Sequence, residues 1–222
     1  MSVRLLAVDT TGEIGSIALV DQQGVVEQVT LHSPEGFAHI LFPAIEALLA
    51  RHALTFGSLD AFASASGPGS FTGVRVGLTA VMGLAEATGR KVVVVSNLQA
   101  LAFYGTRALR AVVVDARRGE VYGAVYDSEL SLVCGEVVVK LPLWLASLPE
   151  GDLELITQGF SVAEAAAPVI EAPRAIAGAV GRIAVDQFLR GNARDPADID
   201  ANYVRRSDAE LLWKDPALLH RS

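Results

Sequence analysis

Three turn-forming segments of the 222-residue chain carry residue types that could bind an anion. Residues 9–12, Asp-Thr-Thr-Gly, follow an apolar strand-like run, and the hydroxyls and N–H groups of such a turn can hold a phosphate. Residues 67–79 lead into an expected helix, whose free N–H groups and dipole favour anions. Residues 115–122 place two guanidiniums between carboxylates, where they could clamp a phosphate or a partner's carboxylate. The candidate anion or nucleotide contacts are Asp9, Thr10, Thr11, Gly67, Gly69, Ser70, Arg117 and Arg118.

Each of these turns also has a purely structural interpretation. Asp9 can stabilise its own turn by bonding the backbone two residues further on. Arg117 and Arg118 can form local ion pairs with the flanking carboxylates, each worth under about 1 kcal/mol. The glycine-rich segment is not a Walker loop, because no Gly-Lys-Ser/Thr occurs in it and its nearby cation is Arg75. From the sequence, both interpretations stay open.

We expect no catalytic residue and no metal site. A zinc site at His39 would need a second histidine one turn on, where Pro43 stands. Cys134 is the only cysteine, which excludes an internal disulfide, and it lies in a strand-like run without a base partner. Ser70 lacks triad partners, and no Gly-x-Ser-x-Gly elbow occurs.

Two expected helices, over residues 35–52 and 72–88, carry a candidate partner surface. Gly73 and Gly77 share one helix face, and each costs up to about 1 kcal/mol relative to alanine, so close packing is needed there. The helix face could pack against the chain's own sheet or against another subunit. We expect both kinds of contact, with the contact to another subunit slightly favoured. Pro43 removes a backbone donor and is expected to bend the first helix. The assigned interface residues are His39, Phe42, Pro43, Glu46, Gly73, Gly77, Ala80 and Leu84.

These segments belong to a unit that occurs twice in the chain. Asp9 and Asp21 each end a strand-like run, and both recur 106 residues later, as Asp115 and Asp127. Each half reads βββαβα, and the last helix of the second half is expected over residues 173–190. This pattern predicts an α/β fold of two duplicated lobes. The two expected domains are 1–106, an N-terminal lobe with the association helices, and 107–222, a C-terminal lobe with the tail.

A duplicated βββαβα unit is similar to the architecture of the actin, heat-shock-chaperone and sugar-kinase superfamily, whose lobes are ribonuclease H-like. In that superfamily the hairpin after the first strand of each lobe faces a nucleotide phosphate. The composition of the two corresponding turns therefore bears on whether this chain is an ATPase.

Composition narrows the functional classes. The net charge of −7 argues against a protein that binds nucleic acid through its main surface without a partner. Mean hydropathy is high, at +0.40, although the richest apolar stretch, 77–85, is too short to span a bilayer. Apolar surface without membrane signals indicates a protein partner. No signal peptide is read at the N-terminus, and a single thiol suits a reducing compartment, so we expect a cytoplasmic protein without membrane contact.

Three segments together resemble one known family. Val8-Asp9-Thr10, Ser66 to Gly77, and Asp115 to Tyr122 are similar to the TsaB (YeaZ) family of bacterial tRNA threonylcarbamoyladenosine biosynthesis proteins. The resemblance covers nearly the whole chain, and the glycine-rich segment is its most specific part. The tail, Tyr203-Val204-Arg205, matches the family's Pro-x-Tyr-Leu-Arg less well, because Ala201 replaces the proline.

The resemblance implies a two-lobed actin-like fold and a non-catalytic role. Such proteins pair with TsaD, a paralogue that keeps metal-binding histidines and transfers the threonylcarbamoyl group to the adenosine next to the anticodon of tRNAs reading ANN codons. TsaE, a small P-loop ATPase, joins the pair. The resemblance also implies that helices 35–52 and 72–88 bind TsaD, or a second copy when TsaD is absent. ATP and metal would then belong to the partner subunits, and tRNA would be met only through the complex.

Two other functions were weighed against this scaffold role. One is a nucleotide-binding hydrolase or kinase of the actin-like fold, and Arg117 and Arg118 argue against it because they stand where an acidic and glycine-rich pattern is needed. The other is a glycoprotease-type metallopeptidase, and the absence of a histidine pair from the sequence argues against that.

Overall fold

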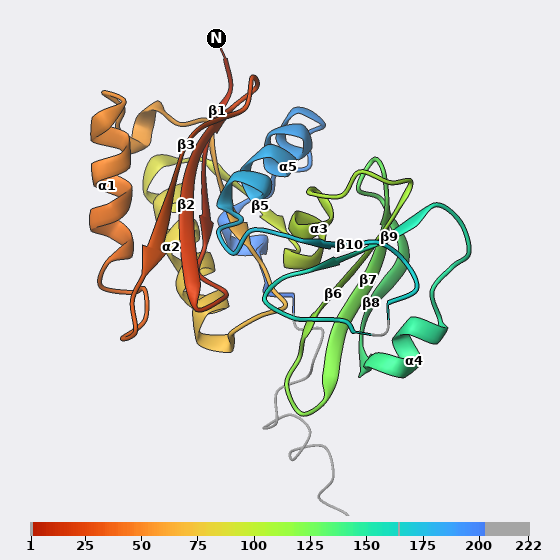
Figure 1. Cartoon of the computed structure of the whole chain (residues 1–222). Coiled ribbons are helices and arrows are strands. Elements are labelled where there is room, and N and C mark those ends of the chain that lie inside the picture. The colour runs from red at the N-terminus through yellow and green to blue at the C-terminus, as the bar shows by residue number, and fades with distance from the viewer. Residues whose placement is uncertain (1, 164, 203–222) are drawn as a thin grey trace, which may run out of the picture.

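The structure, a computed structural model, describes residues 2–163 and 165–202. Two lobes lie side by side, each built on a mixed five-stranded sheet, and residues 103–108 connect them (Figure 1). Within the described residues, no helix has the length and apolar character needed to cross a membrane.

Five strands form the sheet of the N-terminal lobe: β1 (Arg4–Asp9), β2 (Ile14–Asp21), β3 (Val25–His32), β4 (Ala61–Ala65) and β5 (Lys91–Val95). Their order is β3-β2-β1-β4-β5; β1 to β3 form an antiparallel meander, while β4 and β5 run parallel to β1. Helices cover both faces of this sheet, so β1 and β4 are almost continuously apolar and buried. β3 instead alternates in exposure, as an edge strand should.

The C-terminal lobe repeats this plan with five further strands: β6 (Leu109–Asp115), β7 (Glu120–Asp127), β8 (Leu132–Lys140), β9 (Leu153–Thr157) and β10 (Val169–Glu171). Their order, β10-β9-β6-β7-β8, is the order of the first sheet read from its other end, with β8 in the place of β3. The predicted duplicated α/β fold is therefore confirmed.

The two lobes differ in their helices, which are α1 (Leu41–Arg51), α2 (Phe71–Thr88), α3 (Asn97–Ala102), α4 (Leu141–Ala146) and α5 (Ala177–Leu189). Short 3₁₀ turns cover Phe56–Ser58 and Pro196–Asp198. In the first lobe α2 joins β4 to β5, whereas the described residues between β9 and β10 contain no helix. The βββαβα pattern thus gains a fifth strand in each lobe, and β10 follows β9 through an irregular connection.

The predicted helices hold, but two of them begin later than the sequence indicated. The helix expected from residue 35 begins at Leu41, because a turn with Gly36 at φ +92° precedes it. Pro43 therefore lies in the first helical turn, where its missing N–H costs no helix hydrogen bond, so the predicted bend was wrong. The helix expected from residue 173 begins at Ala177.

The α2 helix matches its prediction closely and has clear end signals. Ser70 is its N-cap, and the Ser70 hydroxyl accepts a hydrogen bond of 3.2 Å from the Gly73 N–H. Gly89 follows the last helical residue in the left-handed conformation, with φ +64°.

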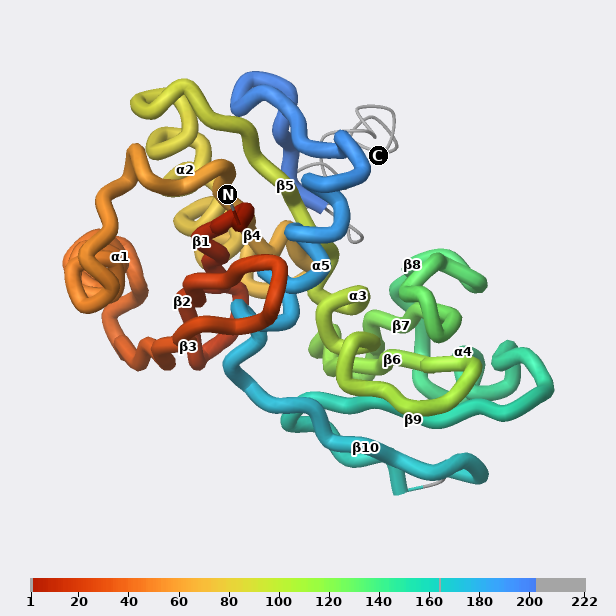
Figure 2. Tube along the Cα trace, turned by 90° about the horizontal axis from the view of Figure 1, so that it is seen from above, coloured from red at the N-terminus to blue at the C-terminus, as the bar shows by residue number. Residues whose placement is uncertain are grey.

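Alternate residues of the first sheet feed two cores, because successive side chains of a strand point to opposite faces. Leu6 and Val8 of β1 join the cluster under α1 and α2, whereas Leu5 and Ala7 join the cluster under α5. Figure 2 shows α1 and α2 on the outer side of the first sheet and α5 on its inner side, next to α3 and the second lobe.

The two halves of the chain interlock through α3 and α5. Although α5 comes late in the sequence, it packs on β1, β2 and β4 of the N-terminal sheet. Its Ala177 N–H donates to the Ser16 hydroxyl at 3.0 Å, and its Gly178 N–H donates to the Gln28 side chain at 2.6 Å. Conversely, α3, which lies in the first half of the chain, packs on β6 and β7 of the C-terminal sheet. The division at residue 106 falls in the connection between α3 and β6, and whether it separates independent units stays a prediction.

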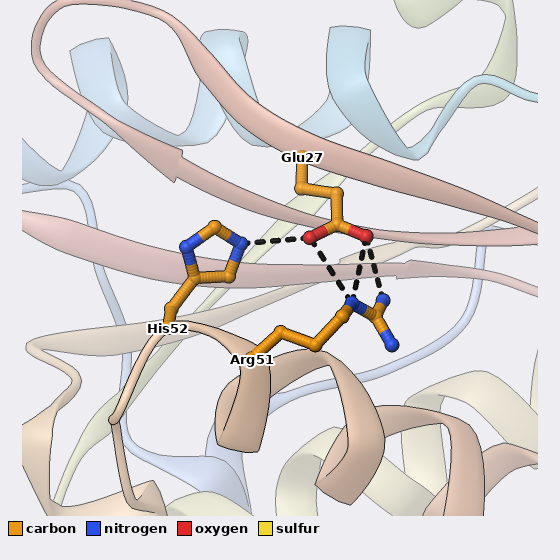
Figure 3. Close-up of polar contacts among 3 residues, drawn as sticks. All are labelled: Glu27, Arg51 and His52. Atoms are coloured by element: carbon orange, nitrogen blue, oxygen red, sulfur yellow. Dashed lines mark hydrogen bonds and ion pairs between the residues drawn. The ribbon is translucent and has the colours of Figure 1, made fainter.

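An ion-pair cluster ties the end of α1 to β3 (Figure 3). The Glu27 carboxylate accepts from two nitrogens of the Arg51 guanidinium, the shorter bond being 2.6 Å, and lies 2.7 Å from His52 Nε2. Both partners lower the pKa of Glu27, the Arg51 hydrogen bond most strongly. The cluster fixes the outer helix on the edge strand of the sheet.

Candidate functional site

A cleft of about 590 Å³ opens between the two lobes, at the ends of β1 and β6. Both first-strand turns and the N-terminus of α2 contribute to its walls. The lining residues are Asp9, Thr11, Gly12, Glu13, Ile14, Pro68, Gly69, Ser70, Asn97, Leu101, Val114, Asp115, Ala116, Arg117, Tyr122, Gln158, Gly159 and Arg174.

Asp9 is the buried acid of this cleft. It ends β1, is only 2% exposed, and its Oδ1 accepts from the Thr11 N–H at 3.0 Å and from the Thr11 hydroxyl at 2.6 Å. Burial raises the pKa of Asp9 from its usual 3.8 to about 6, although the two Thr11 hydrogen bonds act in the opposite direction. The Asx turn predicted from the sequence is therefore present, and it holds a carboxyl group with a raised pKa.

The loop before α2 lies directly on the first turn. The Ser70 N–H donates to the Thr11 carbonyl at 2.7 Å, and a Cβ at Gly69 would stand 2.7 Å from that same oxygen. Glycine is needed at position 69 because the two loops approach this closely. Asn97, the first residue of α3, connects the loops by donating to the Thr11 hydroxyl and accepting from the Gly67 N–H.

The arginine turn faces the cleft from the second lobe. Arg117, Arg118 and Gly119 have φ values of 65°, 58° and 74°, so two non-glycine residues adopt the left-handed conformation in succession. The Arg117 guanidinium lies 3.8 Å from the Asp115 carboxylate and 3.9 Å from Glu13 in the opposite lobe. These exposed contacts support the predicted local ion pairing and extend it across the cleft.

The structure brings together five of the eight candidate anion contacts: Asp9, Thr11, Gly69, Ser70 and Arg117. The other three do not line the cleft. Thr10 is fully buried and its hydroxyl donates to the Gly73 carbonyl at 2.6 Å, while Gly67 lies behind the loop against Asn97. Arg118, also outside the lining, occupies the turn beside Arg117.

Sequence reasoning missed Arg174 and Gln158 as cleft residues. Arg174 lies 3.9 Å from Glu13, so Glu13 stands between two guanidiniums, those of Arg117 and Arg174. Arg174 and Gln158 come from connections around β9 and β10, far along the chain from the turns, and Asn97 at the start of α3 was missed as well. Only the pairing of β9 with β6 brings them to the cleft, and no local pattern marks them.

Comparisons with known proteins decide the family. The family model described as "TsaD: tRNA N6-adenosine threonylcarbamoyltransferase" matches residues 22–190. The chain is 30% identical over 224 residues to the tRNA threonylcarbamoyladenosine biosynthesis protein TsaB of Bacillus subtilis, covering 94% of this chain and 97% of that one. The chain belongs to the TsaB (YeaZ) family. The family is one of tRNA threonylcarbamoyladenosine biosynthesis.

Solved structures agree with this TsaB assignment. YeaZ from Pseudomonas aeruginosa is 27% identical, with a TM-score of 0.74 over 90% of this chain and 99% of that one. A second Pseudomonas aeruginosa structure, an uncharacterized protein described as similar to peptidase YeaZ, is 25% identical, with a TM-score of 0.77 over 91% of this chain and 100% of that one. The chain thus shares its fold with these YeaZ structures over nine-tenths of its length.

In this TsaB-family chain the α2 residues assigned to a partner surface lie inside the lobe. Gly73 and Gly77 face β1, because a Cβ at Gly73 would collide with the Thr10 carbonyl and one at Gly77 would stand 2.7 Å from the Thr10 hydroxyl. Ala80 and Leu84 continue that buried face. Close packing on the chain's own sheet is therefore one reason for the small residues, and a contribution of α2 to a partner surface stays a prediction.

The four α1-region residues assigned to the partner surface are all exposed: His39, Phe42, Pro43 and Glu46. Phe42 exposes 43% of its surface, which is unusual for so large an apolar side chain. Their role stays a prediction.

Two further expectations concern metals and the tail. Within the described ranges, no group of three or more His, Cys, Asp and Glu side chains could hold a metal ion. Cys134 is a half-buried free thiol on β8. The expected family motif at Tyr203-Val204-Arg205 lies outside the described residues.

Proposed function

We propose that this chain is a non-catalytic scaffold subunit in tRNA threonylcarbamoyladenosine biosynthesis, which binds a TsaD homologue and helps to recruit a TsaE homologue. The observation that carries the proposal is the match to TsaB over nearly the full length of both chains. In this proposal ATP and metal belong to the partner subunits, tRNA is met only within the complex, and the isolated chain forms a homodimer. Its site of action is the cytoplasm.

The exposed face of α1 is the proposed docking surface for TsaD. We define the α1 face as His39, Phe42, Pro43, Glu46, Ala47 and Ala50, all of which are exposed. Aromatic side chains are enriched at the centres of protein interfaces, and Phe42 gives this face an apolar centre. The Glu27 cluster fixes the last turn of α1 on β3, so the face is presented on a rigid element.

A second candidate function is nucleotide hydrolysis in the cleft, and Asp9 is the observation that favours it. A buried carboxyl group with a pKa near 6 in a cleft is a common feature of catalytic sites. Calorimetric titration of the isolated chain with ATP separates the two candidates. The scaffold proposal predicts no binding and no turnover, whereas ATP turnover that is abolished by Asp9→Ala would establish the hydrolase.

Reconstitution tests the scaffold role. TsaD and TsaE homologues from the same organism, a tRNA reading ANN codons and a threonylcarbamoyl donor are assayed with and without this chain. We expect modification of the tRNA only when the chain is present, and none from the chain alone. Full modification without it would contradict the proposal.

The arginine turn can be tested in the same assay. Replacing both Arg117 and Arg118 with alanine should impair the complex while changing the free energy of unfolding by less than about 1 kcal/mol, because the ion pairs are exposed. Unchanged modification activity would leave the turn with a structural role only.

A further inference from the structure

The cleft between the lobes presents opposite charges on its two sides. Asp9 and Glu13 come from the first lobe, whereas Arg117 and Arg174 come from the turn after β6 and the connection after β10. Asp115 is the remaining acid of the lining, and its Oδ1 already accepts from the Arg117 N–H at 2.8 Å. A ligand that carries one positive and one negative group would therefore meet a complementary charge on each side.

Asp9 has one carboxylate oxygen left for a ligand. Its Oδ1 accepts both Thr11 hydrogen bonds, and no described residue donates a hydrogen bond to Oδ2. Asp9 is only 2% exposed and lines the cleft, so a donor to Oδ2 would come from the cleft. A buried acceptor without a partner is costly, and a ligand ammonium supplies both N–H donors and a positive charge.

The two arginines have N–H donors without partners. Within the part of the chain that the structure describes, neither the Arg117 nor the Arg174 guanidinium donates a hydrogen bond, and their ion-pair distances are 3.8–3.9 Å. Both side chains are exposed, as is their shared partner Glu13, so these ion pairs are weak. A ligand carboxylate that accepted bidentate bonds from a guanidinium would therefore displace Glu13 at little cost.

Both sheets contribute to one apolar cluster beside the cleft. Leu5 and Ala7 of β1 belong to the same buried cluster as Val112 of β6 and Ile156 of β9. A core shared in this way favours a cleft that is formed before a ligand binds, which lowers the cost of binding. The volume of about 590 Å³ lies within the range of small-molecule sites, about 300–1,000 Å³.

The rest of the lining favours a small ligand with an apolar side chain. The apolar lining residues are Ile14, Leu101 and Val114. An anion with several charges would be repelled by the three carboxylates of the lining, whereas a zwitterion has no net charge to be repelled.

We propose that the cleft binds a small zwitterion with an apolar side chain, an amino acid or a dipeptide, whose ammonium contacts Asp9 Oδ2 and whose carboxylate contacts Arg117 and Arg174. This inference goes beyond the scaffold proposal and does not depend on it, because its test needs no TsaD homologue.

Calorimetric titration of the full chain tests the proposal, at a pH above the raised pKa of Asp9, about 6, so that the carboxyl group is ionised. L-leucine and glycyl-L-leucine are the probes, because they place the two charges at different separations. We expect saturable binding of at least one, and the tighter one identifies the source of the ligand. The amide and the N-acetyl derivative of that probe should each bind about tenfold more weakly or worse, because each loses a charge-assisted hydrogen bond.

Two substitutions assign the charges to their partners. Asp9→Asn should weaken binding of the better probe and remove its advantage over the N-acetyl derivative. Arg174→Gln, at an exposed side chain, should reduce the advantage of the probe over its amide. Asp21→Asn is the matched control for the acid, because Asp21 Oδ1 accepts a backbone N–H at 2.8 Å in a similar turn outside the cleft. Arg190→Gln, at an exposed arginine that follows α5, is the control for the base, and neither control should change binding.

Four outcomes would overturn the inference once circular dichroism has shown that each variant is folded. Neither probe could bind, or a derivative with a single charge could bind as tightly as the zwitterion. Displacement of the probe by ATP would assign the cleft to nucleotides. Equal effects of the control substitutions would place the probe outside the cleft.

Discussion

Asp9 is the residue at which the chemistry of the cleft is concentrated. It ends β1, is buried, and is held by Thr11, whose hydroxyl is contacted in turn by Asn97 of α3. Thr11 thereby links the Asp9 carboxyl group to the start of α3. The pKa near 6 follows from burial, which removes the water that would stabilise the charge.

The buried acid makes a prediction about pH. The pKa of Asp9 is raised in the folded state from 3.8 to about 6, so ionising it opposes folding. That cost is absent below pH 3.8 and fully present above pH 6. Asp9→Asn, which can still accept the Thr11 bonds, should therefore gain stability over the parent by about 3 kcal/mol more at pH 7 than at pH 3.5. Urea unfolding at the two pH values measures it, and an equal difference at both would contradict the assignment.

At the scale of single elements, α2 shows why a helix carries glycines on one face. Gly73 and Gly77 let α2 lie directly on the turn after β1, where Thr10 bonds the Gly73 carbonyl. This contact sets the position of the α2 N-terminus at the cleft. The glycines therefore serve the geometry of the site through packing inside the lobe.

Substitutions along α2 separate packing from helix propensity. Gly73→Ala should lower the free energy of unfolding by about 1–3 kcal/mol, because the added methyl collides with backbone. Gly83 lies on the same helix with nothing within 4 Å of its Cβ position, so Gly83→Ala should raise stability by up to about 1 kcal/mol. Chemical denaturation of both variants is the measurement. A neutral Gly73→Ala would show that α2 does not pack on the turn.

The cluster that anchors α1 makes a second prediction at this scale. Hydrogen bonds from Arg51 and then His52 lower the pKa of Glu27, so its stabilising effect is present above its usual pKa of 4.5 and is lost as the pH falls through the lowered value. Glu27→Gln should reduce the melting temperature at pH 7 and make no difference in strong acid. Melting curves across this range check it, and a difference that does not depend on pH would contradict it.

Most elements of this fold could be predicted because their signals are local. Apolar runs ending in aspartate mark β1 and β6, and Ser70 and Gly89 mark the ends of α2. The packing of α5 on the first sheet could not be predicted from the sequence, because an apolar helix does not specify which sheet it covers. For the same reason the sequence could not assign the glycine face of α2, because glycines allow close packing either against a partner or against the chain's own turn.

For the candidate site, the residues that could be predicted from the sequence are those in the turns. Asp9, Ser70 and Arg117 stand in turns whose chemistry is visible locally, and the structure places all three in the cleft. Arg174 and Gln158 reach it only through the pairing of distant strands. Residues brought in by topology alone leave no local signal.

At the scale of the whole molecule, two interlocked lobes present α1 on the outside, on the side of the first sheet that faces away from the second lobe (Figure 2). The exchange of α3 and α5 ties each half of the chain to the other half's sheet. The scaffold proposal uses the outer surface that α1 presents.

Calorimetric titration of the chain into a TsaD homologue from the same organism tests the central claim most directly. The account predicts a saturable complex that Phe42→Glu weakens at least tenfold, which is about 1.4 kcal/mol, because a charge replaces an exposed aromatic side chain that the complex would bury. Val26→Glu, at an equally exposed valine on β3 of the same lobe, should bind like the parent. No binding by the parent chain, or equal affinity of the parent and Phe42→Glu, would contradict the account.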